Sequence, residues 1–285
     1  AYKVEHYQQA VSGDDYTKVD TDSLSGTTGA TATAGAKSYT GFRESKTHSS
    51  RVASGTIAAD GSLVLKLYYD RETYTVSFDS GGGSTVSSIT GVRYDAAITK
   101  PADPNRTGYT FASWNKQADL TDGWDFSNDK VTSNTTLYAK WAANEYEVTY
   151  EATGGTSSPT KSSVTYNQTY GTLASATKTG YTFDGWYTKA DGAGSKVENS
   201  TVVNTASSHT LYAKWIANKY AVSFDPDGGT ASSTEDKSVT FGQVYGTLPS
   251  ATKVGHTLDG WYTKADGGGS KVESNTVVDT AYNHT

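Results

Sequence analysis

Two carboxylates with identical neighbours are the first candidates for catalysis. Asp184 and Asp259 each precede the sequence Gly-Trp-Tyr-Thr. General acid–base catalysis needs two carboxyl groups across one cleft, in environments that separate their pKa values. These two aspartates stand in separate copies of one segment, and Asp-Gly is a common pair in tight turns. We therefore expect each aspartate to lie in a turn and neither to act in catalysis.

Metal and nucleophile chemistry find little support either. The chain contains no cysteine, which excludes thiolate ligands and disulfides. The five histidines are His6, His48, His209, His256 and His284. None of them shares the spacing of a metal-ligand pair with another. Asp225 and Asp227 precede two glycines, as in a calcium loop, but the further acidic ligands are missing. No serine, threonine or lysine has the partners of a nucleophile, so we expect no metal, no cofactor and no enzyme.

Tryptophan rings are the third candidate, because an exposed indole can stack on a sugar ring. One set recurs inside a repeated segment and another set closes it. Side chains that recur with the strand pattern around them are better explained as anchors of small cores. The aromatic residues that we expect in cores are Trp114, Trp141, Trp186, Trp215, Trp261, Tyr109, Phe111, Tyr181 and Phe183. Trp124 occurs once, before Asp125, and is the one candidate for ligand contact.

The composition favours strands and turns. Of 285 residues, only 35% are hydrophobic, yet 21 are Tyr, 7 Phe and 6 Trp, and 29 are Gly. Apolar area therefore comes from aromatics spread thinly, which suits several small cores. The net charge of −6 and the absence of Lys/Arg runs argue against a nucleic-acid partner. No apolar stretch is long enough for a membrane span, so we expect any export signal or anchor outside this segment.

Internal repeats organise the chain. Matching strand patterns, such as YTVSFDSGGG, begin at Tyr74, Tyr146 and Tyr220, and the hexapeptide TLYAKW ends at Trp141 and Trp215. Residues 1–72 follow the same plan with a divergent sequence. We therefore expect four modules, at residues 1–72, 73–143, 144–217 and 218–285, and refer to them as the first to fourth modules. The fourth stops before its closing strand.

Within a module, alternation of apolar and polar residues predicts strands. In the first module, Leu63, Leu65 and Leu67 alternate with Val64, Lys66 and Tyr68. Glycine pairs after the opening strands predict hairpin turns. Short helical turns fit best at residues 96–101 and 170–176. The linkers between modules hold about four residues, too few for free tumbling.

The repeat pattern resembles the Listeria–Bacteroides repeat, the B-repeat of internalin B and of many large surface proteins. The positions that carry the resemblance in the second module are Pro101, Pro104, Thr107, Gly108, Tyr109, Phe111, Trp114, Trp124, Asp125, Phe126 and the TLYAKW closure. The first module is similar to mucin-binding-protein repeats of gut-bacterial adhesins. The resemblance implies a mainly β fold of the α+β class, made of small β-grasp, ubiquitin-like modules whose first and last strands are parallel. Such modules would form a tandem array shaped as an elongated rod.

The resemblance implies a stalk or adhesive repeat region of a bacterial cell-surface protein, extracellular or in the cell wall. Its partner would be a host or matrix component, such as a glycan or glycoprotein. The alternative is an array of carbohydrate-binding modules for mucin glycans. Exposure of the repeated tryptophan rings separates the two. Because the fourth module lacks its closing strand, we also expect it to accept a strand from a neighbour.

Overall fold

The computed structural model describes all residues, 1–285, and is almost entirely β-structure. The mainly β, tandem-repeat prediction is therefore confirmed. No α-helix is present, and the one helical element is the 3₁₀ turn η1 (Ala190–Gly192). The helical turns expected at residues 96–101 and 170–176 are wrong, because both segments are irregular or extended. The chain divides into two compact units, Ala1–Ala142 and Ala143–Thr285, which are described separately.

The first module contains a four-stranded sheet. Its order is β2 (Tyr16–Leu24), β1 (Tyr2–Gln9), β6 (Val64–Arg71) and β4 (Phe42–Glu44). A second small sheet pairs β3 (Thr31–Thr33) with β5 (Ser54–Thr56). In the closing strand β6, the alternating side chains Leu65 and Leu67 point into the core, where both are fully buried. Tyr69 and Val4 complete the same core.

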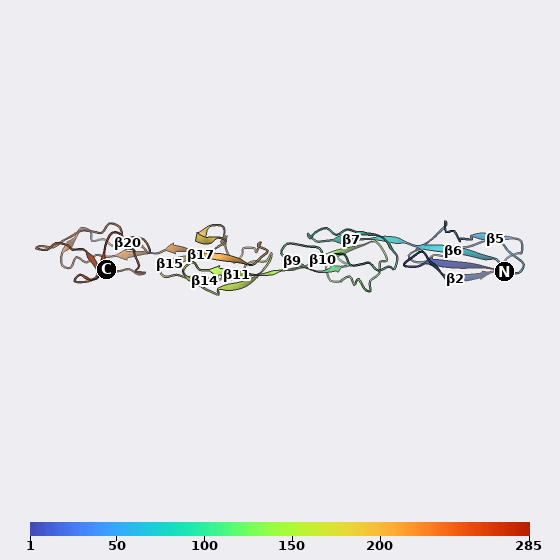
Figure 1. Cartoon of the computed structure of the whole chain (residues 1–285), viewed down its shortest axis with the longest axis horizontal. Helices are drawn as coiled ribbons and strands as arrows, with labels where there is room; N and C mark the ends of the chain where they lie inside the picture. Colours follow the sequence, from blue (N-terminus) through green and yellow to red (C-terminus); the bar gives the residue numbers. More distant parts are fainter. The chain divides into compact units, whose positions relative to one another are not determined.

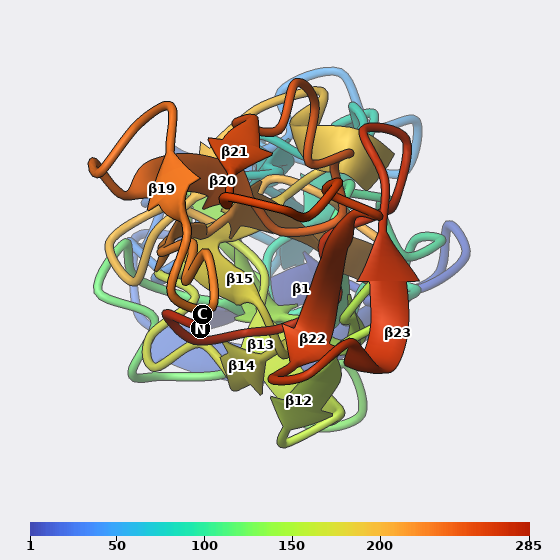
Figure 2. The same ribbon diagram turned by 90° about the vertical axis from the view of Figure 1, so that its left-hand side faces the viewer.

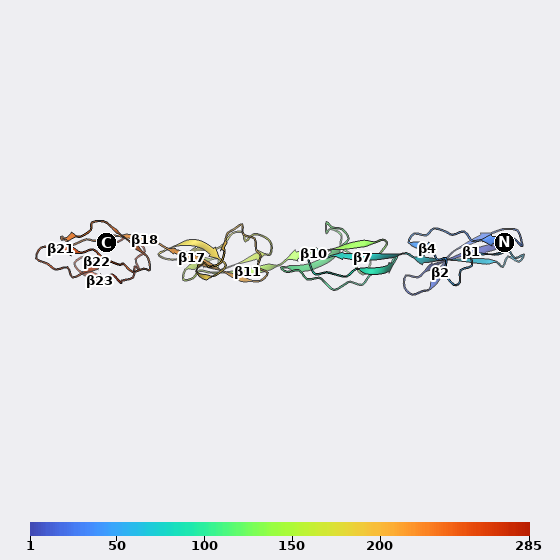
Figure 3. The same cartoon turned by 90° about the horizontal axis from the view of Figure 1, so that it is seen from above.

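The second module completes the first unit with another four-stranded sheet. The order is β8 (Ile89–Arg93), β7 (Thr73–Asp79), β10 (Thr135–Ala143) and β9 (Tyr109–Asn115). Figures 1 and 3 show β7 and β10 side by side. Trp114, Val76, Val131 and Leu137 lie at the centre of the core, each at most 1% exposed.

The third module repeats this plan in the second unit with one more strand. The order is β13 (Lys161–Thr165), β11 (Glu145–Glu151), β17 (His209–Ala217), β15 (Tyr181–Tyr187) and β16 (Lys196–Val197). The residues after the glycine pair form β12 (Thr156–Ser158), which pairs with β14 (Ser175–Thr177). The simple hairpin expected after the glycines is therefore wrong for this module, because the next strand pairs away from the opening strand.

The fourth module has only two-stranded sheets. They are β18 (Lys219–Val222) with β20 (Lys237–Thr240), β19 (Thr230–Ala231) with β21 (Ala251–Thr252), and β22 (Trp261–Lys264) with β23 (Gly268–Val272). Figure 2 shows the β22–β23 hairpin apart from β19, β20 and β21. The described fourth module contains no strand in the position that β17 occupies between β11 and β15. Its buried core is correspondingly small: Val222, Val239, Tyr245 and Val278.

The three complete modules share one relation between their ends. The first and last strands are parallel neighbours: β1 with β6, β7 with β10, and β11 with β17. Parallel neighbours need a long crossover between them, and here irregular loops and short strands supply it. The β-grasp assignment that the resemblance implies stays a prediction, since no helix crosses these sheets.

Candidate functional site

The repeated tryptophans of β9 and β15 lie inside the cores. Trp114 in β9 and Trp186 in β15 are each 1% exposed. Phe78 and Phe111 contact Trp114, and Phe183 contacts Trp186, with ring centroids 4.9 to 5.3 Å apart. A ring enclosed in this way has no free face for a sugar.

The equivalent ring of the fourth module is less enclosed. Trp261 in β22 is half-buried and packs edge-on against Phe224, with centroids 5.0 Å apart. Its indole N–H donates to the carbonyl of Pro249 at 2.8 Å, as Trp186 donates to Ala174 at 2.7 Å. The hydrogen bond is kept although β22 has no strand beside it in the position that β17 occupies beside β15.

The closing tryptophans seal the glycine turns. The Trp141 indole N–H donates to the carbonyl of Ser80 at 2.9 Å, and Trp215 donates to Ala152 at 2.8 Å. A Cβ placed on Gly83 would stand 2.5 Å from the Trp141 ring, and one on Gly155 would stand 2.7 Å from Trp215. Both indoles are half-buried. Their contacts explain the glycines as positions where a ring lies on the backbone.

A cation stacks on these aromatics at the same place in two modules. The Arg106 guanidinium lies 4.0 Å from the Tyr109 ring centroid and 6.0 Å from that of Trp141. In the third module, the Lys178 ammonium lies 4.5 Å from Tyr181 and 6.0 Å from Trp215. Lys178 also donates to a carbonyl of the glycine turn, that of Thr153, at 3.1 Å. These distances are typical of cation–π contacts, and the arrangement closes the turn.

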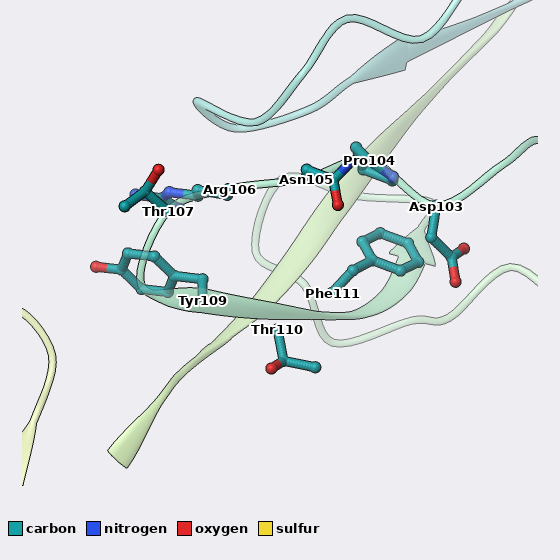
Figure 4. Close-up of a pocket in the computed structure, with 8 residues that line it drawn as sticks. All are labelled: Asp103, Pro104, Asn105, Arg106, Thr107, Tyr109, Thr110 and Phe111. Carbon is teal, nitrogen blue, oxygen red and sulfur yellow. The ribbon is translucent and has the colours of Figure 1, made fainter. Parts of the chain in front are cut away.

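A hollow lies beside this cation in the second module. It is open and measures about 570 Å³. Its lining residues are Asp103, Pro104, Asn105, Arg106, Thr107, Tyr109, Thr110 and Phe111. Figure 4 shows Tyr109 and Phe111 on the loop side of β9 and Thr110 on the opposite side. Lys100 pairs with Asp103 at 2.6 Å and lies 5.7 Å from the Phe111 ring.

This hollow lacks the features of a catalytic site. Its one acidic side chain, Asp103, forms an ion pair about half exposed to solvent. Enzyme and cofactor sites are deeper and bring several polar groups together. The hollow offers a shallow surface with aromatic and basic character.

Trp124, the sequence's candidate for ligand contact, packs against the core of the second module. The side chain is half-buried, and its indole nitrogen is buried. Its backbone N–H donates to the Trp114 carbonyl at 2.8 Å, which ties the following segment to β9. The next residue, Asp125, accepts hydrogen bonds from Ser127 and Asn128. This segment is therefore a folded turn in which Trp124 is partly covered.

Asp184 lies within β15, so the turn expected there is wrong. The register of β15 against β17 shifts between Phe183 and Gly185, which makes Asp-Gly a bulge inside a strand. The Tyr187 hydroxyl donates to Asp184 at 2.7 Å, and Lys214 pairs with it at 3.2 Å. The hydrogen bond from Tyr187, followed by that from Lys214, lowers the pKa of Asp184.

Asp259 occupies the matching position before β22 in the fourth module, again outside a turn. The Tyr262 hydroxyl donates to it, and Lys271 lies 3.4 Å away. The Tyr262 hydrogen bond is the main reason that the pKa of Asp259 is lowered. Each aspartate therefore interacts with a tyrosine and a lysine of its own module. The structure does not bring Asp184 and Asp259 together.

A buried polar network in the first module was missed by sequence reasoning. His6 is fully buried in β1, with Nδ1 2.9 Å from the Tyr69 hydroxyl and Nε2 3.1 Å from Asp22. Lys37 pairs with Asp22 at 2.7 Å and also with Asp20. The signal that could have found it is the alternation of β1, which puts His6 on the same face as Val4.

No group of three or more His, Cys, Asp or Glu side chains is placed to hold a metal ion. None of the helical structure is long and apolar enough to span a membrane. What recurs from module to module is the set of aromatics, glycines and cations that build each core and close its turn.

Comparison with known proteins decides the family. The family model of the Listeria-Bacteroides repeat domain matches residues 74–140, 146–214 and 220–285. The chain belongs to this family. The resemblance of the second, third and fourth modules to these repeats is therefore confirmed. The match begins at residue 74, so the resemblance of the first module to mucin-binding repeats stays a prediction.

Three proteins are similar to this chain over part of their length. A putative Gly-rich membrane protein of Evansella cellulosilytica is 36% identical over 200 residues, covering 70% of this chain and 22% of that protein. A putative membrane protein of the same organism is 34% identical over 218 residues, covering 74% and 32%. Internalin H of Listeria monocytogenes is 35% identical over 166 residues, covering 58% and 29%. The matched part of this chain thus spans about a fifth to a third of the length of these relatives.

Proposed function

We propose that this chain is the spacer region of a bacterial cell-surface protein, in which each module separates what lies before it from what lies after it. The observation that supports this proposal is the parallel pairing of first and last strands in each complete module. Because the two strands run in one direction, the chain enters a module at one end of the sheet and leaves it at the other.

The length of the closing strand sets the separation. β10 and β17 each contain 9 residues, and a strand rises about 3.3 Å per residue. Each complete module therefore separates its neighbours by about 30 Å. A segment with both ends at one pole would add no such distance.

Two further observations fit a non-catalytic role. The repeated side chains are committed to cores and turns, and the open hollow beside Arg106 contains a single acidic side chain, Asp103. The relatives are named as membrane proteins and as an internalin, which supports a location at the bacterial surface or cell wall. We further propose that this region adheres to a host or matrix component.

The alternative, an array of glycan-binding modules, needs aromatic rings exposed at matching positions. Trp114 and Trp186 are each 1% exposed, so they offer no such platform. Trp141 and Trp215 are half-buried and engaged by glycines and a cation. These facts favour the spacer over the glycan-binding array.

The spacer proposal is tested by displaying the chain on a bacterial surface between an anchor and a fluorescent tag. Removing residues 144–217, one complete module, is expected to lower the tag by about 30 Å. Removing the same number of residues from a flexible Gly/Ser linker provides the control. If the height of the tag does not change after this deletion, the spacer role is contradicted. Binding of the chain to immobilised mucin, beyond that of the linker control, would favour adhesion.

A further inference from the structure

The strands of neighbouring modules run almost directly into one another. Within the first unit, β6 ends at Arg71 and β7 begins at Thr73, so only Glu72 separates them. Within the second unit, β17 ends at Ala217 and β18 begins at Lys219, so only Asn218 separates them. The closing strand of one module thus becomes the opening strand of the next after a single residue.

This single residue is held by hydrogen bonds on both sides. The Glu72 N–H donates to the Gly41 carbonyl at 2.9 Å, and the Glu72 carbonyl accepts from Tyr94 at 2.8 Å. Gly41 belongs to the first module and Tyr94 to the second. The linking residue therefore cannot swivel without breaking a bond to one of its neighbours.

The second unit repeats these bonds. The Asn218 N–H donates to the Gly180 carbonyl at 2.9 Å, and the Asn218 carbonyl accepts from Phe241 at 2.9 Å. The Asn218 side chain also accepts from the Thr182 hydroxyl at 2.6 Å. Because the same two backbone hydrogen bonds occur at Glu72 and at Asn218, the bonded junction is a repeated structural feature.

Arginine side chains add to the junction in the first unit. Arg71 donates through Nε to the Gln9 carbonyl and through Nη1 to the Tyr94 carbonyl, both at 2.9 Å. Arg93, at the end of β8, reaches back to the carbonyl of Gly13 and, at 3.2 Å, to Asp14. Both arginines therefore bridge the first and second modules.

Inside each complete module, tension between the two ends falls on the parallel strand pair. The leading end of the first strand and the trailing end of the last strand are pulled in opposite directions, so their hydrogen bonds are loaded in shear. In shear the bonds must break together, whereas in peeling they break one after another. A pair loaded in shear therefore has the higher barrier to forced unfolding, which is governed by the unfolding rate.

We infer that this chain bears mechanical load: tension passes along each closing strand, through the bonded linking residue, into the next opening strand, and is resisted by the parallel pairs. This function goes beyond the proposed spacer role, since a spacer needs length and not strength. The two can fail separately.

The modules should differ in strength according to the extent of their parallel pairs. In the first module, residues 3–8 lie beside residues 64–69. In the second, residues 76–79 lie beside 135–138, and in the third, residues 148–151 lie beside 209–212. In the fourth, the parallel contact is a bridge between Val222 and His284. The fourth module is therefore an internal control with almost no shear pair.

The test is single-molecule force spectroscopy of the whole chain, held between marker domains. A complete module of about 70 residues should release about 220 Å of contour length, at about 3.5 Å per residue less its folded span. The fourth module should open at the lowest force and the first at the highest. Ten Gly/Ser residues inserted between Asp266 and Gly267, in the β22–β23 turn, lengthen the fourth-module event by about 35 Å and so identify it.

A second pulling direction uses the same folded protein. The chain has no cysteine, so Cys substitutions E151C and Y212C provide unique points for handles. These two positions are partners across β11 and β17. Pulling there peels the pair, and we expect a force well below that of end-to-end pulling. Equal forces in the two directions, or a fourth module as strong as the third, would overturn the inference. The chain could resist force in these experiments while removal of residues 144–217 leaves the height of the displayed tag unchanged. That outcome would support load bearing and contradict the spacer role.

Discussion

The ring of Phe241 lies directly on the backbone of Gly180. A Cβ on Gly180 would stand 2.3 Å from the ring, and the glycine has a φ of +79°. Gly180 belongs to the third module and Phe241 to the fourth, so this contact forms the junction between them. Tyr94 covers Gly41 in the same way in the first unit, where a Cβ would stand 2.1 Å from the ring.

Substitution G180A should therefore loosen the junction. The added methyl group meets Phe241, and the positive φ is strained for alanine, so we expect a loss of about 1–3 kcal/mol. Hydrogen exchange at the Asn218 and Phe241 amides should become faster. Substitution G171A is the matched control, since Gly171 also has a positive φ (+68°) but open space around it. If both variants lose the same stability, the ring contact contributes nothing.

The hydrogen bonds around the buried histidine of the first module should place a proton on one particular ring nitrogen. The Lys37 backbone N–H donates to the Tyr69 hydroxyl at 2.9 Å, so that hydroxyl directs its own hydrogen to His6 Nδ1. Nε2 then carries the proton and donates to Asp22. Two-bond ¹⁵N–¹H NMR correlations of His6 should show the Nε2–H form at neutral pH, and an Nδ1–H form would contradict this network.

Removing the Tyr69 hydroxyl should be costly. Substitution Y69F leaves the His6 nitrogen and the Lys37 amide without this partner, and a buried group left unpaired costs about 1–3 kcal/mol. Chemical denaturation, with a signal from the first module, measures the change in the free energy of unfolding. Substitution Y7F removes a hydroxyl bonded to Glu5 at the partly exposed face of the neighbouring strand β1 and should cost less. Equal losses would mean that burial of the network is unimportant.

Loss of the indole N–H should affect the two central tryptophans differently. Trp186 donates to Ala174 at 2.7 Å, whereas the buried Trp114 nitrogen has no hydrogen-bond partner in the structure. Substitutions W186F and W114F remove similar volume, but only the first also removes a hydrogen bond and leaves a carbonyl unpaired. We expect W186F to cost about 1 kcal/mol more. The unfolding free energies of the two variants, compared in the whole chain, check this difference.

Acid should weaken the third module through Asp184. Its pKa is lowered in the folded state, first by Tyr187 and then by Lys214. A carboxyl with a lowered folded pKa contributes stability above its ordinary pKa and loses it as the pH falls through the folded pKa. Stability should therefore decline below about pH 4, and substitution D184N should flatten the decline. A decline that D184N leaves unchanged would contradict this role of Asp184.

Much of the fold follows from local patterns in the sequence. Alternation in the opening and closing strands predicts which residues are buried, as Leu65 and Leu67 show, and repetition predicts that Trp114 and Trp186 share one environment. These signals work because a strand has a period of two and a small core depends on a few large rings.

The remainder depends on which segments meet in space. The partners of His6 come from β2 and β6, and Lys37 reaches the same network through Asp22, at sequence separations that no local pattern records. The bulge at Asp184 arises from register against β17, although its Asp-Gly pair reads as a turn. A glycine at position 180 indicates special backbone geometry, but the ring that covers it belongs to another module.

The single-residue junctions have a genetic consequence. The third module presents Gly180 to the module after it, and the fourth receives that glycine with Phe241, so the two halves of a seam belong to different copies of the repeat. A module that carries both the glycine at one end and the covering ring at the other can be duplicated or deleted in frame. Its new neighbours then still form the same glycine–ring contact. Lineages can then lengthen or shorten the protein by whole modules while the contact at each junction is kept.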